Sequence, residues 1–326
     1  MIAKERTIPI KILASEALLR RLPADFVMRP LIEKDLAKRK AGFRGEVATD
    51  YYVHKLPKKE FTILHDLRLS NGQDYFQIDT LIISPTFALI LEIKNISGTL
   101  FFDSKFKQLI RYRNDSEDGF LNPISQADRQ KRELLSWLLR YNVSIPIEFL
   151  VVISNPSTVI KSDSQNYFAF KNVLHAHGMT ERVGKIKASY KKEVLTKREM
   201  NKLTKTLFKS HTPETFDVLN HYKISANSLV TGVQCTKCKE ARMKRIYGSW
   251  QCTVCGHKER GAHKRALLDY YLLLGNKISN QQFRSFLQLS NEDISQKLLK
   301  SMELPHSGEN KGRVYYLDIG LFQDIL

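Results

Sequence analysis

Two carboxylates and a lysine stand close together in a segment whose pattern predicts a tight β-hairpin. Residues 76–84 and 87–94 are rich in β-branched and large apolar side chains, and a short Ser-Pro-Thr turn joins them. Asp79 lies in the first run, and Glu92 and Lys94 end the second. Successive side chains of a strand point to opposite faces, so Glu92 and Lys94 share one face. Antiparallel pairing with a small register offset or a bulge would bring Asp79 close to Glu92.

This set of groups suits hydrolysis of a phosphodiester. A hard cation such as Mg²⁺ takes two carboxylates, such as those of Asp79 and Glu92, and keeps several waters, one of which can serve as the nucleophile. An ammonium group beside the cation, such as that of Lys94, stabilises charge that develops on the phosphate. The alternative is a strand that carries a solvated Glu and Lys on its outer face, which is how most Glu-x-Lys triplets arise.

Two more polar residues lie on predicted helices. Glu46 follows Gly45 in a helical stretch over about residues 28–53, and it is either a solvated helix charge or part of a site. Gln126 follows Asn122-Pro123, a good cap and first-turn pair, and it either bonds to a nearby backbone group or faces the end of the sheet. The first helix has an approximate 3.6-residue stripe, which predicts an inward face of Leu31, Leu36, Phe43, Val47 and Tyr51.

Together these motifs resemble a known family. The motifs are Gly45-Glu46, Gln77-Ile78-Asp79, Leu91-Glu92-Ile93-Lys94-Asn95, Gly98 and Asn122-Pro123-x-x-Gln126. Over about residues 40–155 they look like the nuclease-related domain (NERD) of the PD-(D/E)xK nuclease-like superfamily. Many relatives carry His directly after the motif Asp, where this chain has Thr80. Strand alternation points that side chain away from Asp79, so the change is not expected to disable the site.

The resemblance implies the fold and the roles of individual residues. It implies an α/β, restriction-endonuclease-like mixed sheet flanked by helices. Asp79 and Glu92 would be ligands of Mg²⁺ or Mn²⁺, and Lys94 would be the catalytic lysine. Glu46 and Gln126 would be supporting polar groups.

The second chemical signal is a pair of Cys-x-x-Cys knuckles separated by thirteen residues. Four thiolates at this spacing can close tetrahedrally around one Zn²⁺, and such a closed site serves folding rather than chemistry. The alternatives are two disulfides or free thiols. The chain has only four cysteines, and all of them belong to the pattern: Cys235, Cys238, Cys252 and Cys255.

The C-terminal region reads as helix, helix, helix and hairpin, the order of a winged helix-turn-helix. Helices are predicted over about residues 264–274, 280–287 and 290–302, with a strand near 313–317. The third helix can enter the major groove of DNA while the wing touches phosphates. The alternative is a protein-interaction module. The candidate contacts to nucleic acid are Lys297, Lys300, Lys311 and Arg313.

Composition favours a polyanionic partner. The 326 residues include 52 Lys and Arg against 34 Asp and Glu, a formal net charge of +18. Such a protein attracts nucleic acid through counterion release, which predicts DNA as the partner, with RNA as the alternative. An apolar run long enough to span a membrane is absent from the sequence, and the N-terminus lacks a signal-peptide core, which predicts a cytoplasmic protein without a membrane partner.

The length predicts several domains. We expect a nuclease-like domain with helical extensions over residues 1–225, a zinc ribbon over 230–260 and a winged-helix-like domain over 261–326. A strand is predicted over about 167–174. The expected function is metal-dependent hydrolysis of DNA phosphodiesters, with C-terminal modules that hold the substrate. The alternatives are a catalytically silent nucleic-acid-binding protein on the same scaffold and a regulator that binds a specific operator.

Overall fold

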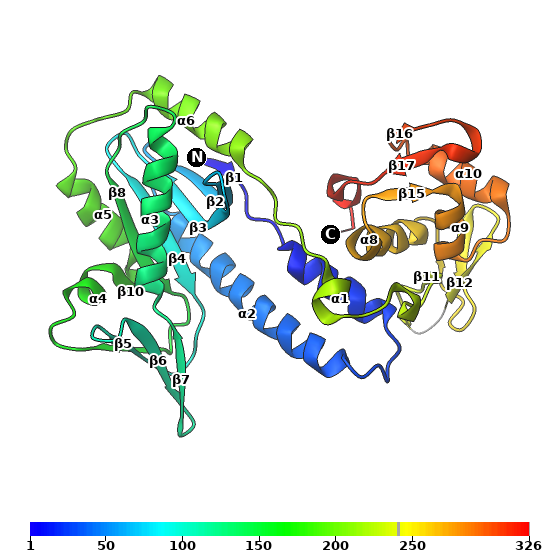
Figure 1. Ribbon diagram of the computed structural model, residues 1–326, viewed down its shortest axis with the longest axis horizontal. Coiled ribbons are helices and arrows are strands. Elements are labelled where there is room, and N and C mark those ends of the chain that lie inside the picture. The colour runs from blue at the N-terminus through cyan, green and yellow to red at the C-terminus, as the bar shows by residue number, and fades with distance from the viewer. Residues whose placement is uncertain (240–241, 326) are drawn as a thin grey trace. The chain divides into compact units, whose positions relative to one another are not determined.

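The computed structural model describes residues 1–239 and 242–325 (Figure 1). The chain forms two compact units. The first unit comprises Met1–Ile8 and Arg39–Glu214, and the second comprises Pro9–Lys38 and Thr215–Leu326. Among the described residues, no helix is both long enough and apolar enough to cross a membrane.

A six-stranded mixed sheet forms the centre of the first unit. Its strands, in spatial order, are β1 (Ile2–Lys4), β2 (Thr62–Ser70), β3 (Tyr75–Ile83), β4 (Ala88–Lys94), β8 (Ile147–Ile153) and β10 (Val173–His175). β2, β3 and β4 pair in antiparallel fashion, whereas β1 joins β2 and β8 joins both β4 and β10 in parallel. The predicted hairpin and the predicted mixed α/β fold are confirmed.

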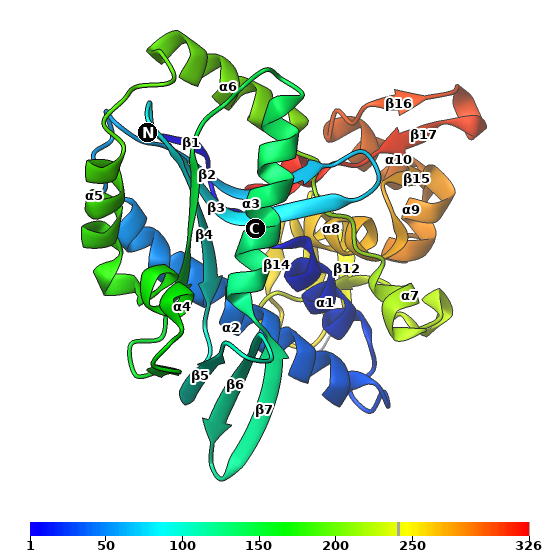
Figure 2. The same cartoon turned by 60° about the vertical axis from the view of Figure 1, so that its left-hand side comes forward.

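Helices cover both faces of this sheet. They are α2 (Arg29–Val53), α3 (Pro123–Leu139), α4 (Tyr167–Asn172), α5 (Met179–Ser189) and α6 (Lys197–Ser210). Leu134 of α3 and Leu203 of α6 belong to the core on one face, and Val53 of α2 and Met179 of α5 belong to the core on the other. Figures 1 and 2 show α2 and α3 on opposite sides of the sheet. Burial on both faces explains the nearly continuous apolar run of β4.

A second sheet extends from the first unit. It contains β7 (Ser116–Leu121), β6 (Gln108–Arg113), β5 (Thr99–Asp103) and β9 (Val159–Ser162), in that spatial order. Gly98 precedes β5 with φ +105°, and a Cβ there would lie 2.7 Å from the carbonyl oxygen of Tyr112. The backbone therefore requires glycine where the chain leaves the central sheet.

The second unit combines an N-terminal helix with the C-terminal third of the chain. Its helices are α1 (Ile10–Arg21), α7 (Val218–Tyr222), α8 (Ala262–Leu274), α9 (Asn280–Leu287) and α10 (Glu292–Ser301). One sheet contains β11 (Val233–Gln234), β12 (Arg242–Ile246), β13 (Ser249–Cys252) and β14 (Lys258–Glu259). A second sheet has the spatial order β15 (Lys277–Ser279), β17 (Val314–Tyr316) and β16 (His306–Ser307).

The boundaries of these units differ from the domain ranges expected from sequence. One apolar core holds Leu18 of α1, Trp250 of the cysteine-bearing sheet and Phe283 of α9. Asp269 of α8 also accepts hydrogen bonds from Arg20 and Arg21 of α1 at 2.6 and 2.7 Å. Residues 9–38 therefore pack with residues 215–326, and the cysteine-bearing segment shares a core with the helices that follow it.

Two local predictions are wrong. The stripe expected to face inward on α2 includes Leu31, Val47 and Tyr51, whose side chains are exposed. Ile32 and Thr49 are buried on that helix instead. Residues 167–172, expected to be a strand, form α4, because Asn166 caps a helix there by accepting a hydrogen bond from the amide of Ala169.

Candidate active site and cysteine cluster

The end of β4 places Glu92 and Lys94 side by side. Lys94 Nζ lies 2.6 Å from Glu92 Oε1, and the glutamate side chain is buried whereas the lysine is partly exposed. β4 and β8 are paired along this stretch, with Glu92 opposite Val151 and Lys94 opposite Ile153. The solvated Glu-x-Lys alternative therefore does not hold for Glu92, which lies inside the protein.

Helix α3 supports this pair from one face of the sheet. Asn122 caps the helix by accepting a hydrogen bond from the amide of Ile124, as its sequence predicted. In the first turn, Gln126 Oε1 accepts a hydrogen bond of 3.1 Å from Lys94 Nζ. One turn later, Gln130 Nε2 donates to Glu92 Oε2 at 2.7 Å. The cap therefore fixes a helix whose two glutamines hold the lysine and the carboxylate in place.

Asp79 lies where the pairing of β3 with β4 ends. The last paired residues there are Thr80 and Leu91, so the next residues along the two strands are Asp79 and Glu92. Instead of continuing the ladder, Asp79 Oδ2 accepts a hydrogen bond of 2.8 Å from the amide of Ile93. The register brings the two carboxylates together at the point where the two strands separate.

Glu46 reaches the site from α2. A Cβ at Gly45 would lie 2.4 Å from Asn95 Cβ and 2.5 Å from Ser154 Oγ, so only glycine lets the helix approach the ends of β4 and β8 this closely. Glu46 is the next residue, and the negative charge of Asp79 acts on its carboxylate. Gly45 thus allows the close packing that brings a third carboxylate, that of Glu46, to the site.

Arg6 neutralises much of this negative charge. Its guanidinium group donates to Glu46 at 2.8 Å, to Asp50 at 2.8 and 3.0 Å and to Asp66 at 2.8 Å. It also donates to Thr80 Oγ1 at 3.0 Å, and the Arg6 side chain is only 4% exposed. A buried cation within hydrogen-bond distance of three carboxylates keeps an acidic cluster inside the fold.

The carboxyl groups perturb one another. Burial, followed by the charge of Asp79, raises the pKa of Glu92 to about 7. The same two causes raise the pKa of Glu46 to about 7. Burial also raises the pKa values of Asp79 and Asp66. Crowded carboxyl groups that resist ionisation are the environment in which a bound divalent cation relieves the most repulsion.

The structure brings together all five residues that the sequence placed at the site: Glu46, Asp79, Glu92, Lys94 and Gln126. Four further residues were not expected there: Arg6, Asp50, Asp66 and Gln130. The sequence could have indicated Gln130 as a site residue, since it lies one helical turn after Gln126. No feature of the sequence indicates Arg6 as a site residue, because only the pairing of β1 with β2 brings the N-terminal segment to the site.

The four cysteines converge in the second unit. Their sulfur atoms all lie within 4.8 Å of one another, with 3.7 Å between Cys235 and Cys255 and 3.6 Å between Cys238 and Cys252. A disulfide requires about 2.05 Å, whereas tetrahedral Zn–S bonds of about 2.3 Å place sulfurs about 3.8 Å apart. The arrangement fits a structural zinc ion and not two disulfides, consistent with the predicted zinc ribbon.

The predicted contacts to nucleic acid lie in the second unit. Lys297 and Lys300 are exposed on α10, as expected. Arg313 is partly buried, and its Nε has no hydrogen-bond partner among the described residues. The side chain of Lys311 lies outside the described residues.

The fold and the carboxylate–lysine cluster define a nuclease-like α/β domain. Residues 41–154 match the family model of the nuclease-related domain, NERD, and this segment is accordingly a nuclease-related domain. The resemblance seen in the sequence is confirmed, and the match contains Glu46, Asp79, Glu92, Lys94 and Gln126. The chain has no match among curated proteins and none among solved structures.

Proposed function

We propose that this protein is a metal-dependent nuclease that hydrolyses phosphodiester bonds of DNA. One observation supports the proposal most: the buried Glu92 carboxylate lies against Lys94 at 2.6 Å, with the charge of Asp79 close enough to raise its pKa. A lone structural ion pair would not need a second carboxylate. Two acids beside one lysine, with Glu46 acting on Asp79 as a third carboxylate, suit a cation and a phosphate.

Each residue of this site would have a distinct role in hydrolysis. When bound, Mg²⁺ or Mn²⁺ supplies a Lewis acid that offsets phosphate charge and lowers the pKa of water. Asp79 and Glu92 would hold the cation, with Glu46 as a supporting carboxylate. Lys94 is partly exposed, so its ammonium group can stabilise the extra negative charge of the pentacoordinate phosphorane, and Gln126 keeps that group oriented.

Substitution of Glu92 tests the proposal. Glu92→Gln keeps the shape and the bond to Gln130 but removes the charge, and we expect cleavage of linear, circular and single-stranded DNA to fall by at least about 100-fold. Lys94→Met should have a similar effect, because it removes the ammonium group. Glu117→Gln, an exposed position on β7, is the matched control and should cut at the wild-type rate.

Three outcomes decide between the candidate functions. Cleavage that requires Mg²⁺ or Mn²⁺ and is abolished only in the site variants supports the nuclease. Wild-type cleavage by highly purified Glu92→Gln would overturn the site assignment. Binding of DNA without cleavage under any metal condition would favour the catalytically silent scaffold instead, and RNA substrates in the same assay decide the class of nucleic acid.

We also propose that the second unit is a zinc ribbon followed by a winged helix that contacts DNA. The spacing of the four sulfurs supports Zn²⁺ as the resident ion, and reduced thiolates suit a cytoplasmic location. The order α8, β15, α9, α10, β16, β17, with β17 between β15 and β16, supports the winged helix. Lys297 and Lys300 then lie on the recognition helix α10, and Arg313 lies beside β17 in the wing.

This assignment can be tested in the full-length chain. The double variant Lys297→Gln/Lys300→Gln should weaken DNA binding and lower the slope of log K against log salt by about 0.9 for each phosphate that the protein no longer neutralises. Lys264 and Lys277 lie on the same unit outside α10, and their double Gln variant controls for net charge. Equal weakening in the two variants would remove α10 from the binding surface.

A further inference from the structure

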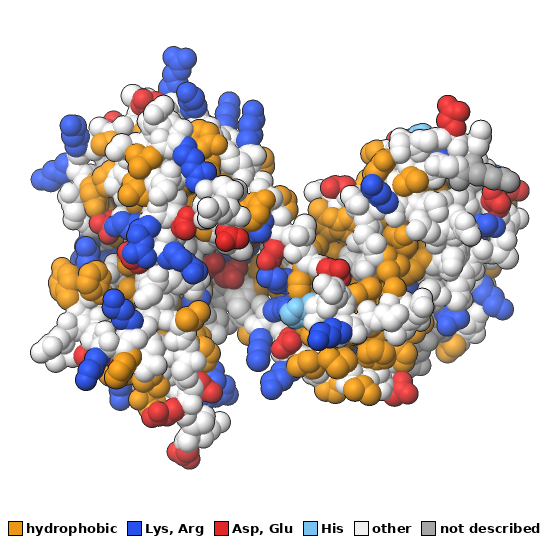
Figure 3. All heavy atoms as spheres, viewed as in Figure 1, with side chains coloured by type: hydrophobic (Ala, Val, Ile, Leu, Met, Phe, Trp, Pro, Cys, Tyr) orange, Lys and Arg blue, Asp and Glu red, His pale blue; other side chains and the backbone are white. Residues whose placement is uncertain are grey.

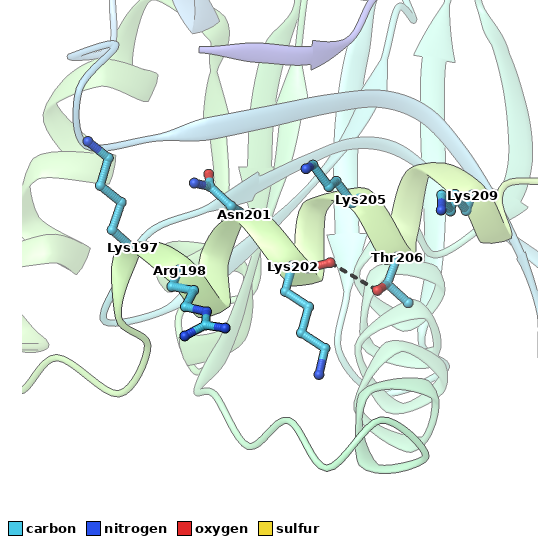
Figure 4. A pocket seen from close by; sticks show the side chains of 7 residues that line it. All are labelled: Lys197, Arg198, Asn201, Lys202, Lys205, Thr206 and Lys209. Atoms are coloured by element: carbon cyan, nitrogen blue, oxygen red, sulfur yellow. Dashed lines mark hydrogen bonds between the residues drawn. The ribbon is translucent and has the colours of Figure 1, made fainter.

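Helix α6 carries a basic face that is not part of the proposed active site. Five of its exposed residues are cations: Lys197, Arg198, Lys202, Lys205 and Lys209. Figure 4 shows Lys197, Asn201 and Lys205 extending on one side of the helix and Arg198 and Lys202 on the other. All of these side chains come from a single helix, so the feature is an open basic surface and not an enclosed cavity.

The spacing makes a continuous row. Arg198, Lys202, Lys205 and Lys209 recur at intervals of four, three and four residues, which places their Cα atoms within about 60° of arc on a helix. From this stripe, the side chain of Lys205 extends to one side and those of Arg198 and Lys202 extend to the other (Figure 4). At about 1.5 Å per residue, the row is about 16 Å long. In the space-filling view, Lys and Arg side chains project where α6 forms the surface of the first unit (Figure 3).

The charge of this row is not neutralised within the protein. Among the described residues, none of the five cations forms an ion pair within 4 Å of an acidic group. Glu199, the acidic residue of the helix, is held in a capping box with Thr196. Lys185 and Lys187 of α5 provide the contrast, because they pair with Glu181 and Glu60.

The opposite face of α6 is already buried. Met200, Leu203 and Leu207 pack into the core beneath the central sheet. A helix that binds a membrane needs a free apolar face, and on α6 the one exposed large apolar side chain is Phe208. A polyanion that binds through its phosphates needs only the cations.

The C-terminal end of α6 leads toward the active site. Just beyond the helix, His211 Nδ1 accepts a hydrogen bond of 3.1 Å from the amide of Arg68, and the amide of Thr212 donates to the carbonyl of Arg68 at 2.9 Å. Asp66, which pairs with Arg6, lies two residues from Arg68 on β2, about 7 Å along the strand. The row of cations therefore ends beside β2, the strand that carries Asp66 of the carboxylate cluster.

We propose that the exposed face of α6 binds the phosphate backbone of the nucleic-acid substrate and guides it to the Asp79–Glu92–Lys94 site. The inference rests on the proposed nuclease function for its substrate class. Contacts of this kind position a strand without reading its bases, so the surface should bind DNA independently of sequence.

The test neutralises the row in the full-length protein. The α6 variant replaces Arg198, Lys202, Lys205 and Lys209 with Gln. The control variant removes the same charge from exposed lysines elsewhere on the first unit: Lys58, Lys59, Lys161 and Lys171. Binding of fluorescent duplex and single-stranded DNA is measured by anisotropy over a series of salt concentrations around ~100 mM, where phosphate contacts dominate the salt dependence, in a Glu92→Gln background so that no substrate is cut.

We expect the α6 variant to bind at least about 10-fold more weakly than the control variant near ~100 mM salt. Its salt slope on duplex DNA should fall by up to about 3.6, which is about 0.9 for each of four phosphates. With Glu92 restored, KM should rise while kcat is unchanged. Melting curves that match the wild type show that the substitutions leave the fold intact.

Other outcomes overturn the proposal. Equal affinity and equal salt slope in the two variants would show that α6 does not touch DNA, and this result would leave the nuclease assignment standing. Weaker binding of the α6 variant to phosphatidylserine vesicles, with DNA binding retained, would assign the surface to membranes. Failure of the nuclease proposal would instead appear as wild-type protein that never cleaves, whatever α6 binds.

Discussion

Arg6 forms hydrogen bonds to more helices and strands of the first unit than any residue of the sequence motifs does. It is a buried cation whose hydrogen bonds reach α2 at Glu46 and Asp50, β2 at Asp66 and β3 at Thr80. Its guanidinium group offsets charge that would otherwise make the carboxylate cluster repel itself. The N-terminal segment is thus part of the site although it lies outside residues 41–154.

Replacement of Arg6 should destabilise the first unit. Arg6→Met leaves Glu46, Asp50 and Asp66 buried without their common partner, and we expect the free energy of unfolding to fall by about 3–5 kcal/mol. Urea unfolding of the purified variant measures this decrease. Arg44→Met changes an exposed residue of α2 and should stay within about 0.5 kcal/mol of wild type. A decrease below about 1 kcal/mol for Arg6→Met would show that the acids are stabilised by other means.

Histidine 263 gives the second unit an acid-sensitive position. Burial, followed by the charges of Arg245 and Lys264, lowers the pKa of His263 to about 4. Its Nδ1 also accepts a hydrogen bond of 3.3 Å from Trp250 Nε1, which requires the neutral ring. The folded state then binds fewer protons than the unfolded chain between about pH 4 and 6.5, so stability falls as the pH drops through that window.

A pH series tests this linkage. The shift corresponds to at most about 3 kcal/mol of stability that disappears between about pH 6.5 and 4. His263→Phe removes the titrating group, so its unfolding transition should change less with pH than that of the wild type. His306→Gln alters an exposed histidine of the same unit and should keep the wild-type slope. Identical pH profiles for all three proteins would mean that His263 does not contribute.

At the scale of elements, two kinds of metal site are expected to behave differently. In the proposed zinc ribbon the four thiolates would close around their ion, whereas the proposed carboxylate site at the end of β4 would keep open positions for water and phosphate. The sheet that bears the cysteines shares a core with α1, α8 and α9, so its metal should stabilise the whole second unit.

Chelation should separate the two sites. Brief treatment with EDTA should stop cleavage and leave about one zinc per chain, because Zn²⁺ is held far more tightly than Mg²⁺. Elemental analysis and a cleavage assay after added Mg²⁺ measure both effects. Cys238→Ser should lose the zinc and lower the melting temperature. Freshly purified protein without zinc would rule out the ribbon.

At the scale of the whole molecule, two separate segments of the chain form the second unit. Residues 9–38 supply α1, whose apolar side chains Leu13, Ala17 and Leu18 are buried in the core formed with residues 215–326. The buried Arg21 pairs with Asp269 across 248 residues of sequence. The two ends of the chain are therefore mutually dependent for folding.

Truncation reveals this dependence. Removal of residues 215–326 should leave α1 with an exposed apolar face and Arg21 without its carboxylate, so we expect aggregation rather than an isolated nuclease domain. Size-exclusion chromatography and binding of a hydrophobic dye report the outcome. A monomeric truncated protein with little dye binding would mean that α1 is stable without the second unit.

The sequence by itself determined the local chemistry of this protein. Strand alternation fixed Glu92 and Lys94 on one face, the Asn122 cap fixed the start of α3 near Gln126, and the cysteine spacing predicted a cluster of four sulfur atoms. Helix α9 begins and ends at the predicted residues. These features follow from interactions between residues close in sequence, whose geometry is the same wherever the element lies.

The tertiary structure decided which distant segments meet. Nothing local to Arg6 indicates that β1 delivers it to an acidic cluster, and nothing local to α1 indicates that it packs against α8. The buried face of α2 also departed from its 3.6-residue pattern, because its polar residue Asp50 faces Arg6 and its polar residue Thr49 is buried as well. A helix buries the side that its neighbours occupy, and those neighbours are set by packing across the chain.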